Sequence, residues 1–277
     1  MKLGSTVITV LLFSAVAKAQ LGWQPLSPED VLVIDTSKGR VLVEMRSDMA
    51  PESVARVKLL TREGVYDGLQ FHRVIAHFVA QTGNPNNRDG GVSSHPDLPA
   101  EFIFRFKPST AEVMATDASD SVSGFLGSVP FQGVPLADVN RRADGLLRAW
   151  GAYCPGVVGM GRQDAPGSAN SEIFFTLDAS RRLDRDYAVW GRVLDGFQAL
   201  QSLAIGEPPL QPDVMIKVRV LADLPPSERP SVSLPDRSAL AELIARIRNA
   251  KGADFSVCDV EVPVRVETPA LPEGRRE

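Results

Sequence analysis

An arginine stands at the head of an apolar stretch in FHRVIAHFVAQTGNP, residues 71–85. A guanidinium stays protonated at any physiological pH, so Arg73 can offer a fixed charge to a reacting group. The chain has three histidines, His72, His77 and His95, and they lack the spacing and the additional ligands of a zinc or iron site. The stretch therefore predicts electrostatic chemistry without a metal.

Other kinds of chemistry find no support in the sequence. It contains no GxSxG, no HExxH and no glycine loop of the kind that cradles phosphate. Neither Cys154 nor Cys258 has a histidine close by in the sequence that would make it a nucleophile. The formal net charge of -4 argues against nucleic acid as a partner. Covalent catalysis and nucleic-acid binding are not expected.

Strands and a helix must position Arg73. VLVID and RVLVEM flank a turn in which Gly39 can adopt the positive φ that a hairpin needs. A helix is predicted over APESVARVKLLTREG, because Pro51 suits its first turn, Val54, Val57 and Leu60 recur on one face, and Gly64 suits its end. The FHR stretch then begins as a strand.

Further strands are predicted at GVVGMG, EIFFTL, YAVWGRVL and 214–221, with a short helical pattern at 197–203. Residues 107–150 are rich in Ser, Asp, Gly and Ala and read as a long irregular insertion. The proline-rich text after Asp223 predicts a linker. In the tail, SALAELIARIRNAKG predicts an amphipathic helix with Asp236 or Ser238 as its cap and Gly252 as its stop.

The amino terminus has the features of a secretory signal peptide. Lys2 precedes an apolar run, and Ala17-Lys18-Ala19 suits signal peptidase, so residues 1–19 are predicted to be removed. The run is too short to span a bilayer comfortably, although an uncleaved anchor remains an alternative. We therefore expect an exported protein without a stable membrane span, periplasmic if the source is a Gram-negative bacterium.

Three blocks of the sequence, in this order, are similar to the cyclophilin-type peptidyl-prolyl cis/trans isomerases, and most of all to bacterial members. They are APESVARVKLLTREGVYDGLQFHRVI with FVAQTG, then GVVGMGRQDAPGSANSEIFF, then LDRDYAVWGRV. The resemblance covers about residues 31–220 apart from the insertion. It implies a closed eight-stranded antiparallel β-barrel capped by two helices, with the isomerase domain at residues 29–222 and a helical extension within 223–277.

The resemblance also implies a role for each matching residue. Arg73 corresponds to the family's catalytic arginine. Phe78 would be the floor of the proline pocket and Phe174 a second wall, while the backbone of 161–162 would hold the residue before the proline. The implied substrate-binding residues are Phe78, Val79, Gln81, Gly161, Arg162, Glu172, Phe174, Leu183 and Tyr187.

Elementary chemistry agrees with this placement. Rotation about an X-Pro bond has a barrier of roughly 18–20 kcal/mol because amide resonance must be lost. The prolyl nitrogen regains a lone pair as the bond twists, and a guanidinium beside it favours the twisted state. The reaction needs no cofactor, and the expected partners are proline-containing polypeptides. The alternative is a module that binds such segments, or acts as a chaperone, with little turnover. A monomer is expected.

Three departures from the family pattern affect the pocket. Val79 replaces a methionine, Glu172 replaces a glutamine, and Arg182 stands where many eukaryotic members have a tryptophan. The pocket is expected to be shallower and more polar at its rim, and strong cyclosporin binding is not expected. Glu172 is predicted to form a salt bridge with Arg73.

The two cysteines are predicted to form a disulfide between the insertion and the tail. Cys154 lies in AWGAYCPG, at the end of the insertion, and Cys258 lies in ADFSVCDV, just after the tail helix. A tail with one amphipathic helix has too little core to fold alone, and an oxidising compartment permits the bond. Two buried free thiols are the alternative.

Overall fold

The strand–turn–strand segment at residues 31–45 begins an eight-stranded antiparallel sheet with the order β14-β2-β3-β13-β11-β12-β5-β4. The computed structural model describes residues 22–87, 92–108, 112–117 and 120–269, so the predicted signal peptide lies outside the described residues. The strands are β2 (Val31–Thr36), β3 (Gly39–Met45), β4 (Arg73–Ile75), β5 (Val79–Thr82), β11 (Val157–Met160), β12 (Ile173–Thr176), β13 (Val189–Asp195) and β14 (Met215–Val220).

This sheet curls so that its two ends approach each other. An isolated antiparallel bridge joins Gln70 to Val214, next to the outermost strands β4 and β14. Gly39 is the first residue of β3 and has a φ of 132°, the positive value predicted for the hairpin turn. The eight-stranded antiparallel class is confirmed, in the form of a curled half-barrel whose ends meet through isolated bridges.

Two helices accompany the sheet. α1 (Pro51–Arg62) has Pro51 in its first turn and buries Val54, Val57 and Leu60 against the core. It ends at Glu63, followed by Gly64 with a φ of 72°. α3 (Phe197–Gln201) packs on β3. The apolar core of the curled sheet is therefore covered as the periodicity predicted.

Residues 104–151 correct the sequence analysis, because the predicted irregular insertion is a second antiparallel sheet with the order β6-β10-β9-β8-β7. Its short strands carry Ser and Gly between large apolar residues, which hides the alternation. Phe125, Phe131 and Leu147 are nevertheless fully buried in it. The elements are β6 (Phe104–Phe106), β7 (Glu112–Asp117), β8 (Val122–Leu126), β9 (Val129–Gly133), α2 (Leu136–Asn140) and β10 (Leu147–Gly151).

The proline-rich linker was also predicted incompletely. Part of it forms β15 (Ser231–Pro235), the middle strand between β1 (Trp23–Pro25) and β16 (Arg265–Glu267). Proline is usually found in edge strands, because it cannot donate a ladder hydrogen bond. In the central strand β15, Pro235 is the last residue, where a missing donor interrupts the ladder least. The extension therefore contains strands as well as a helix.

The tail helix α4 (Arg237–Lys251) follows β15 and has the predicted caps. The Asp236 carboxylate accepts a hydrogen bond from the Ala239 amide at 2.9 Å, and Gly252 ends the helix with a φ of 60°. Leu240 and Ile244 are buried in the core that the second sheet provides. Short 3-10 turns complete the described chain: η1 (Pro28–Asp30), η2 (Arg181–Leu183), η3 (Leu221–Asp223), η4 (Pro226–Glu228), η5 (Gly252–Asp254) and η6 (Val257–Asp259).

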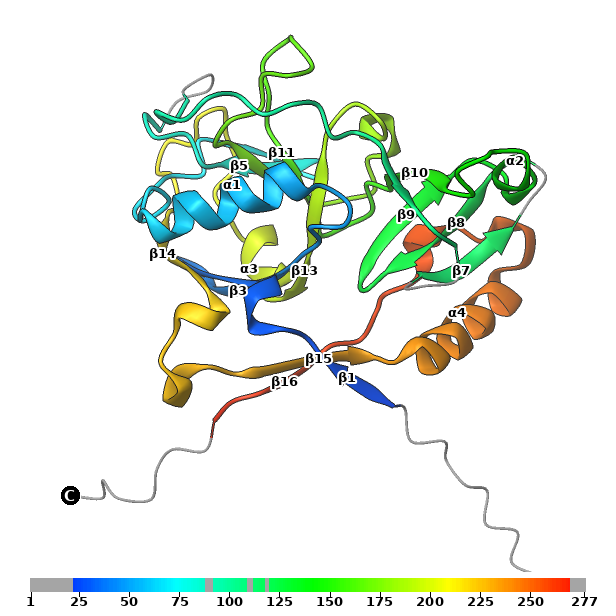
Figure 1. Ribbon diagram of the computed structural model, residues 1–277. Coiled ribbons are helices and arrows are strands. Elements are labelled where there is room, and N and C mark those ends of the chain that lie inside the picture. Colours follow the sequence, from blue (N-terminus) through cyan, green and yellow to red (C-terminus); the bar gives the residue numbers. More distant parts are fainter. Residues whose placement is uncertain (1–21, 88–91, 109–111, 118–119, 270–277) are drawn as a thin grey trace, which may run out of the picture.

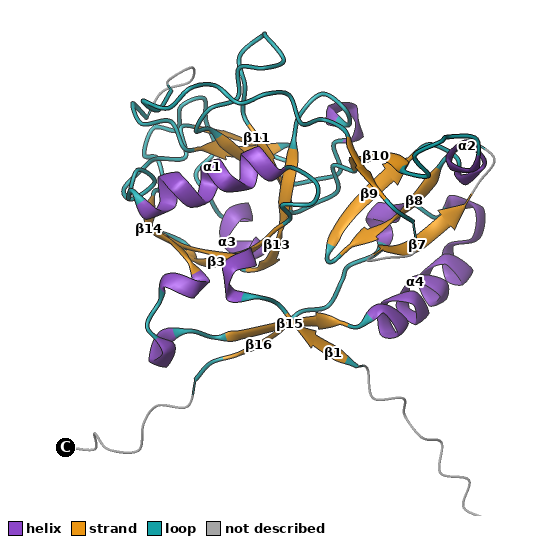
Figure 2. Cartoon of the chain, viewed as in Figure 1, coloured by secondary structure: helices purple, strands orange, loops and turns teal. Residues whose placement is uncertain are grey.

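The elements form two lobes (Figure 1, Figure 2). The barrel lobe comprises the eight-stranded sheet with α1 and α3. The insertion lobe comprises β6–β10, α2 and the tail segment 236–262, whose helix α4 packs on β7. The small β1-β15-β16 sheet lies below both lobes in Figure 1. Segments far apart in the sequence therefore build the insertion lobe together.

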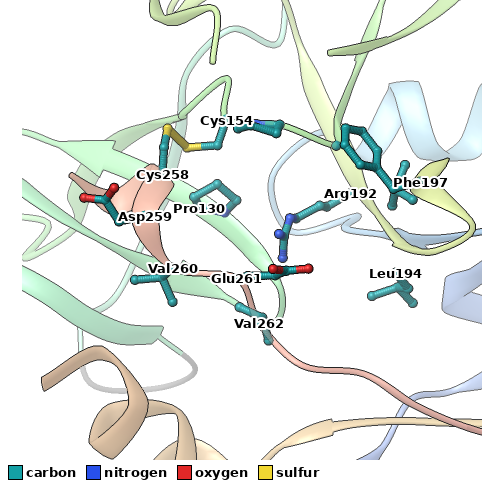
Figure 3. Close-up of a pocket in the computed structure, with 13 residues that line it drawn as sticks. Pro130, Cys154, Arg192, Leu194, Phe197, Cys258, Asp259, Val260, Glu261 and Val262 are labelled. Atoms are coloured by element: carbon teal, nitrogen blue, oxygen red, sulfur yellow. A yellow bond between two sulfur atoms is a disulfide. The ribbon is translucent and has the colours of Figure 1, made fainter. Parts of the chain in front are cut away.

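Cys154 and Cys258 are bonded in the structure, which is the predicted pairing, with 5.0 Å between their Cα atoms. A cavity of about 340 Å³ opens beside the bond, and Arg192 points across it toward Glu261 (Figure 3). Burial lowers the pKa of Arg192, while the carboxylates of Glu261 and Glu44 act in the opposite direction. The disulfide thus lies where the tail crosses between the lobes.

Candidate active site

Strand register brings the predicted site residues into one row across three strands. Arg73 on β4 pairs with Gln81 on β5, and Gln81 pairs with Phe174 on β12. Directly paired residues point to the same face of a sheet. The opposite face, with Val74 and Phe175, belongs to the barrel core. The row therefore lies on the face of the sheet opposite the barrel core.

Two polar side chains hold the Arg73 guanidinium. Its Nε donates to the Glu207 carboxylate at 2.6 Å, and its Nη1 donates to the Gln81 side-chain oxygen at 3.3 Å. The Arg73 side chain is 28% exposed. Reciprocal backbone hydrogen bonds between Val74 and Gly206 attach the Glu207 loop to β4. The charge is thus oriented yet open to a ligand.

The predicted direct salt bridge between Glu172 and Arg73 is replaced by a relay, because Gln81 lies between them. The Glu172 carboxylate accepts from Gln81 Nε2 at 2.7 Å and from Asn84 Nδ2 at 2.8 Å. His72 Nε2 lies 3.7 Å from the same carboxylate. Glu172 is buried and therefore fixes the Gln81 amide, whose oxygen is left to face Arg73.

Aromatic rings form one wall beside the row. Phe174 stacks on Tyr153 at 5.6 Å and meets Tyr187 edge-on at 5.5 Å. Gly159 lies opposite Phe174 in the ladder, and a Cβ there would stand 2.6 Å from the Phe174 ring, so only glycine fits. Burial, with a smaller contribution from Asp184, raises the pKa of Tyr153 well above its usual value. Tyr153 therefore remains a neutral part of the wall.

Phe78 and Val79 lie at the turn between β4 and β5. Val79 is buried, whereas Phe78 is half-buried and packs against the same apolar cluster as Leu183 and Tyr187. Two guanidiniums approach the Phe78 ring, that of Arg182 at 4.3 Å from its centroid and that of Arg73 at 5.9 Å. The predicted floor and rim residues thus meet around this ring.

Gly161 and Arg162 follow β11 and border the site from the other side. The Gly161 amide donates to the Glu172 carbonyl at 2.7 Å. The Arg162 side chain lies over the Tyr187 ring at 4.6 Å and forms an ion pair with Asp186 at 2.6 Å. Arg162 therefore braces the rim through its side chain, a contact that the sequence did not predict.

The rim segment 181–187 is held by the insertion lobe. Arg181 donates to the Gln132 side chain of β9 at 2.7 Å, and Arg185 lies over the Trp150 ring of β10 at 4.8 Å. The Asp184 carboxylate accepts from the Tyr153 amide at 2.9 Å. The insertion thus positions the segment that carries Leu183 and Tyr187.

Several residues of this site escaped the sequence analysis. Glu207 is separated from Arg73 by more than a hundred positions, and nothing local marks it. Asn84 lies at the end of the FVAQTG block and could have been suspected as a polar neighbour of Gln81. Tyr153 gave no signal, because it follows the stretch 107–150 that was interpreted as irregular and precedes the predicted strand GVVGMG. Glu207 and Tyr153 are therefore recognised only from their long-range contacts in the folded chain.

Neither a metal cluster nor a membrane-spanning helix is found in the described part of the chain. No three His, Cys, Asp or Glu side chains gather there in a way that could hold a metal ion. No described helix is both long and apolar enough to cross a bilayer.

Comparison with known proteins gives a consistent result. Residues 31–220 match the family model described as cyclophilin type peptidyl-prolyl cis-trans isomerase/CLD. A probable peptidyl-prolyl cis-trans isomerase of Brucella suis is 32% identical over 212 residues, which cover 71% of this chain and 85% of that protein. The isomerase ppi1 of Schizosaccharomyces pombe is 25% identical over 194 residues, covering 68% of this chain and 97% of that one.

A solved structure extends the similarity beyond the family model. The crystal structure of cyclophilin AquaCyp293 from Hirschia baltica has a TM-score of 0.82 and 31% identity, and the match covers 90% of this chain and 94% of that chain. The matched share is larger than residues 31–220, so the similarity extends into the segments that flank the family match.

Proposed function

Since the chain belongs to the cyclophilin-type peptidyl-prolyl cis-trans isomerase family, we propose that it isomerises X-Pro bonds of exported proteins, with Arg73 as the catalytic residue. The observation that carries the site assignment is the row of Arg73, Gln81 and Phe174 across three paired strands. It places a fixed charge next to an aromatic wall. A proline ring against that wall presents its nitrogen to the charge.

Arg73 acts on the twisted state of the substrate. Pyramidalisation gives the prolyl nitrogen a lone pair, to which the guanidinium can donate, whereas the planar amide offers none. Gln81 fixes the orientation of the guanidinium, and the buried Glu172 fixes Gln81. Because the donors are oriented before the substrate arrives, little reorganisation is needed as the bond rotates.

The apolar side chains bind the proline ring. Phe78, Val79, Phe174 and Leu183 belong to or pack on one apolar cluster, and Tyr187 closes it edge-on against Phe174. Placing a proline here removes apolar surface from water in both planar isomers and in the twisted state alike. The pocket therefore supplies affinity, and Arg73 supplies the rate.

Two features support clients in an exported compartment. The first is the Lys2 and Ala17-Lys18-Ala19 pattern at the amino terminus. The second is the Cys154–Cys258 disulfide, which persists in oxidising compartments and is rare in the cytosol. We place the protein in the periplasm if its source is a Gram-negative bacterium.

One experiment tests turnover and another tests export. Residues 20–277 should accelerate cis–trans exchange of a proline peptide, measured by NMR exchange spectroscopy without an auxiliary protease. Binding of the peptide without acceleration would instead favour the binding module. Mass spectrometry of the chain made in a Gram-negative host should find Gln20 as the first residue of a periplasmic form. An intact, cytoplasmic chain would contradict export.

A further inference from the structure

The guanidiniums around the pocket differ in whether a carboxylate neutralises them. Arg73 pairs with Glu207, Arg162 with Asp186, and Arg181 with Asp184, each at 2.6 Å. In each pair the carboxylate offsets the positive charge of the arginine, so an approaching ligand is attracted less strongly. Arg182 and Arg185 lie on the same rim segment and are exposed.

Arg182 and Arg185 each contact an aromatic ring instead of an acid. Arg182 lies 4.3 Å from the Phe78 centroid and Arg185 lies 4.8 Å from the Trp150 centroid. Neither has an ion-pair partner among the residues that the structure describes. The rings hold the flat guanidinium faces in place and leave their N–H edges available.

The remaining acids near the rim do not cancel these two charges. Asp178 accepts a hydrogen bond from the Ala179 amide at 2.7 Å. Glu172 is buried behind Gln81. The rim segment 181–187 carries one positive charge in excess, with three arginines against Asp184 and Asp186, although the whole chain has a formal net charge of -4.

We propose that Arg182 and Arg185 form a subsite for a carboxylate side chain of the substrate, so that the enzyme prefers Asp or Glu close to the proline. The inference rests on the proposed proline pocket, because Phe78 is both the floor of that pocket and the ring beneath Arg182. Successive Cα atoms are about 3.8 Å apart, so an acidic residue one or two positions from the bound proline reaches a guanidinium over Phe78.

The same geometry places a second cation near the catalytic one. The guanidiniums of Arg73 and Arg182 lie 5.9 Å and 4.3 Å from the centroid of the same ring, and neighbouring like charges repel each other. Glu207 compensates Arg73 only. A substrate carboxylate compensates Arg182 and leaves Arg73 oriented for catalysis.

The test uses proline peptides that carry Glu, Gln or Lys one or two positions before or after the proline. With residues 20–277 at low salt, kcat/KM should be about two- to fivefold higher for Glu than for Gln at one of these positions, the size of an exposed ion pair. Lys should be poorer than Gln. The preference should shrink at 0.5 M salt, which screens exposed charges.

Charge reversal identifies the residues. Arg182→Glu should invert the Glu-to-Lys order, Arg182→Lys should keep it, and Arg182→Glu/Arg185→Glu should invert it further. Arg141→Glu is the matched control, because Arg141 is exposed on the insertion lobe beyond α2 and changes the net charge equally. Its preference should equal that of the parent.

Two results would overturn the proposal: equal kcat/KM for Glu, Gln and Lys peptides at all four positions, or an unchanged preference in the double reversal. Failure of the proposed function is a separate result, namely no acceleration of any peptide. Binding of the same peptides, followed by NMR titration, still decides the subsite in that case. A Glu peptide that binds no tighter than its Gln counterpart would refute it.

Discussion

The barrel lobe and the insertion lobe differ in how many chain segments supply their cores. The apolar core of the barrel lobe comes from strands and helices between residues 32 and 220, within the family match. The core of the insertion lobe combines residues of 104–151 with Leu240, Ile244 and Val260 from the tail, and it continues into the pocket wall at Phe174. The main core of the barrel lobe takes no residue from the tail beyond residue 220, whereas the core of the insertion lobe depends on the tail.

This difference separates the sources of stability and of catalysis. The polar relay from Glu172 through Gln81 to Arg73 lies on the barrel lobe. The lobes meet at the buried Glu44, whose carboxylate accepts a hydrogen bond from the Ser128 amide at 2.8 Å. They also meet at the rim segment, where Arg181 contacts β9 and Arg185 contacts β10. Changes in the tail should therefore alter stability, and changes in the relay should alter rate.

The largest expected effect is removal of the disulfide. It closes a loop of 104 residues, so Cys154→Ser/Cys258→Ser should lower the free energy of unfolding of the insertion lobe by about 3–5 kcal/mol on the chain-entropy model. Hydrogen exchange should accelerate in 104–151 and 236–262 before it does in the barrel strands. Isomerase activity at 25 °C should stay within about twofold of the parent, since the relay is elsewhere. Unchanged hydrogen-exchange protection of 236–262 would show that the insertion lobe does not depend on the disulfide.

Replacement of Arg73 should have the opposite signature. Arg73→Ala should lower kcat/KM by about 100-fold or more, equivalent to about 3 kcal/mol of transition-state stabilisation. The thermal midpoint should barely change, because the side chain is partly exposed. Arg73→Lys, which keeps the charge and loses the planar fork, is the matched control and should be intermediate. An alanine variant as fast as the parent would remove the catalytic assignment.

Glu172→Gln tests the relay and should have a moderate effect. The carboxylate accepts from both Gln81 and Asn84. A single amide oxygen satisfies these two donors less well, so kcat/KM should fall about fivefold, or about 1 kcal/mol. KM should change less than kcat, because the proline pocket is untouched. A rise in kcat would instead favour the direct salt bridge that the sequence predicted, in which the Glu172 carboxylate partly neutralises Arg73.

The smallest effect concerns the contact between the lobes at the rim. Gln132→Ala removes the acceptor for Arg181, and loss of this one partly buried hydrogen bond should raise KM about twofold with kcat unchanged. Peptide titrations and steady-state rates measure the two separately. Gln132→Glu, which restores an acceptor, should return KM toward the parent. A change confined to kcat would mean that the insertion acts on the relay.

The sequence was informative where short-range patterns determine structure. The hairpin at Gly39, the helix that starts at Pro51 and the capped tail helix all depend on neighbouring residues, and all are present. Three family-like blocks predicted Arg73, Phe78 and Phe174 together. Strand register brings Arg73 and Phe174 into one row, and the Arg73 guanidinium lies 5.9 Å from the Phe78 centroid. The reasons are local: turn geometry, helix periodicity and caps act over a few residues.

Only the tertiary structure showed how distant segments complete these elements. The short strands of 104–151 have little alternation of their own, and they form a sheet because α4 and the tail supply apolar partners. Arg73 donates to Glu207, and Gln81 rather than Arg73 donates to Glu172. Strand order and the attachment of the loops set these distances. Local patterns determine which elements form, whereas long-range packing determines which charges meet.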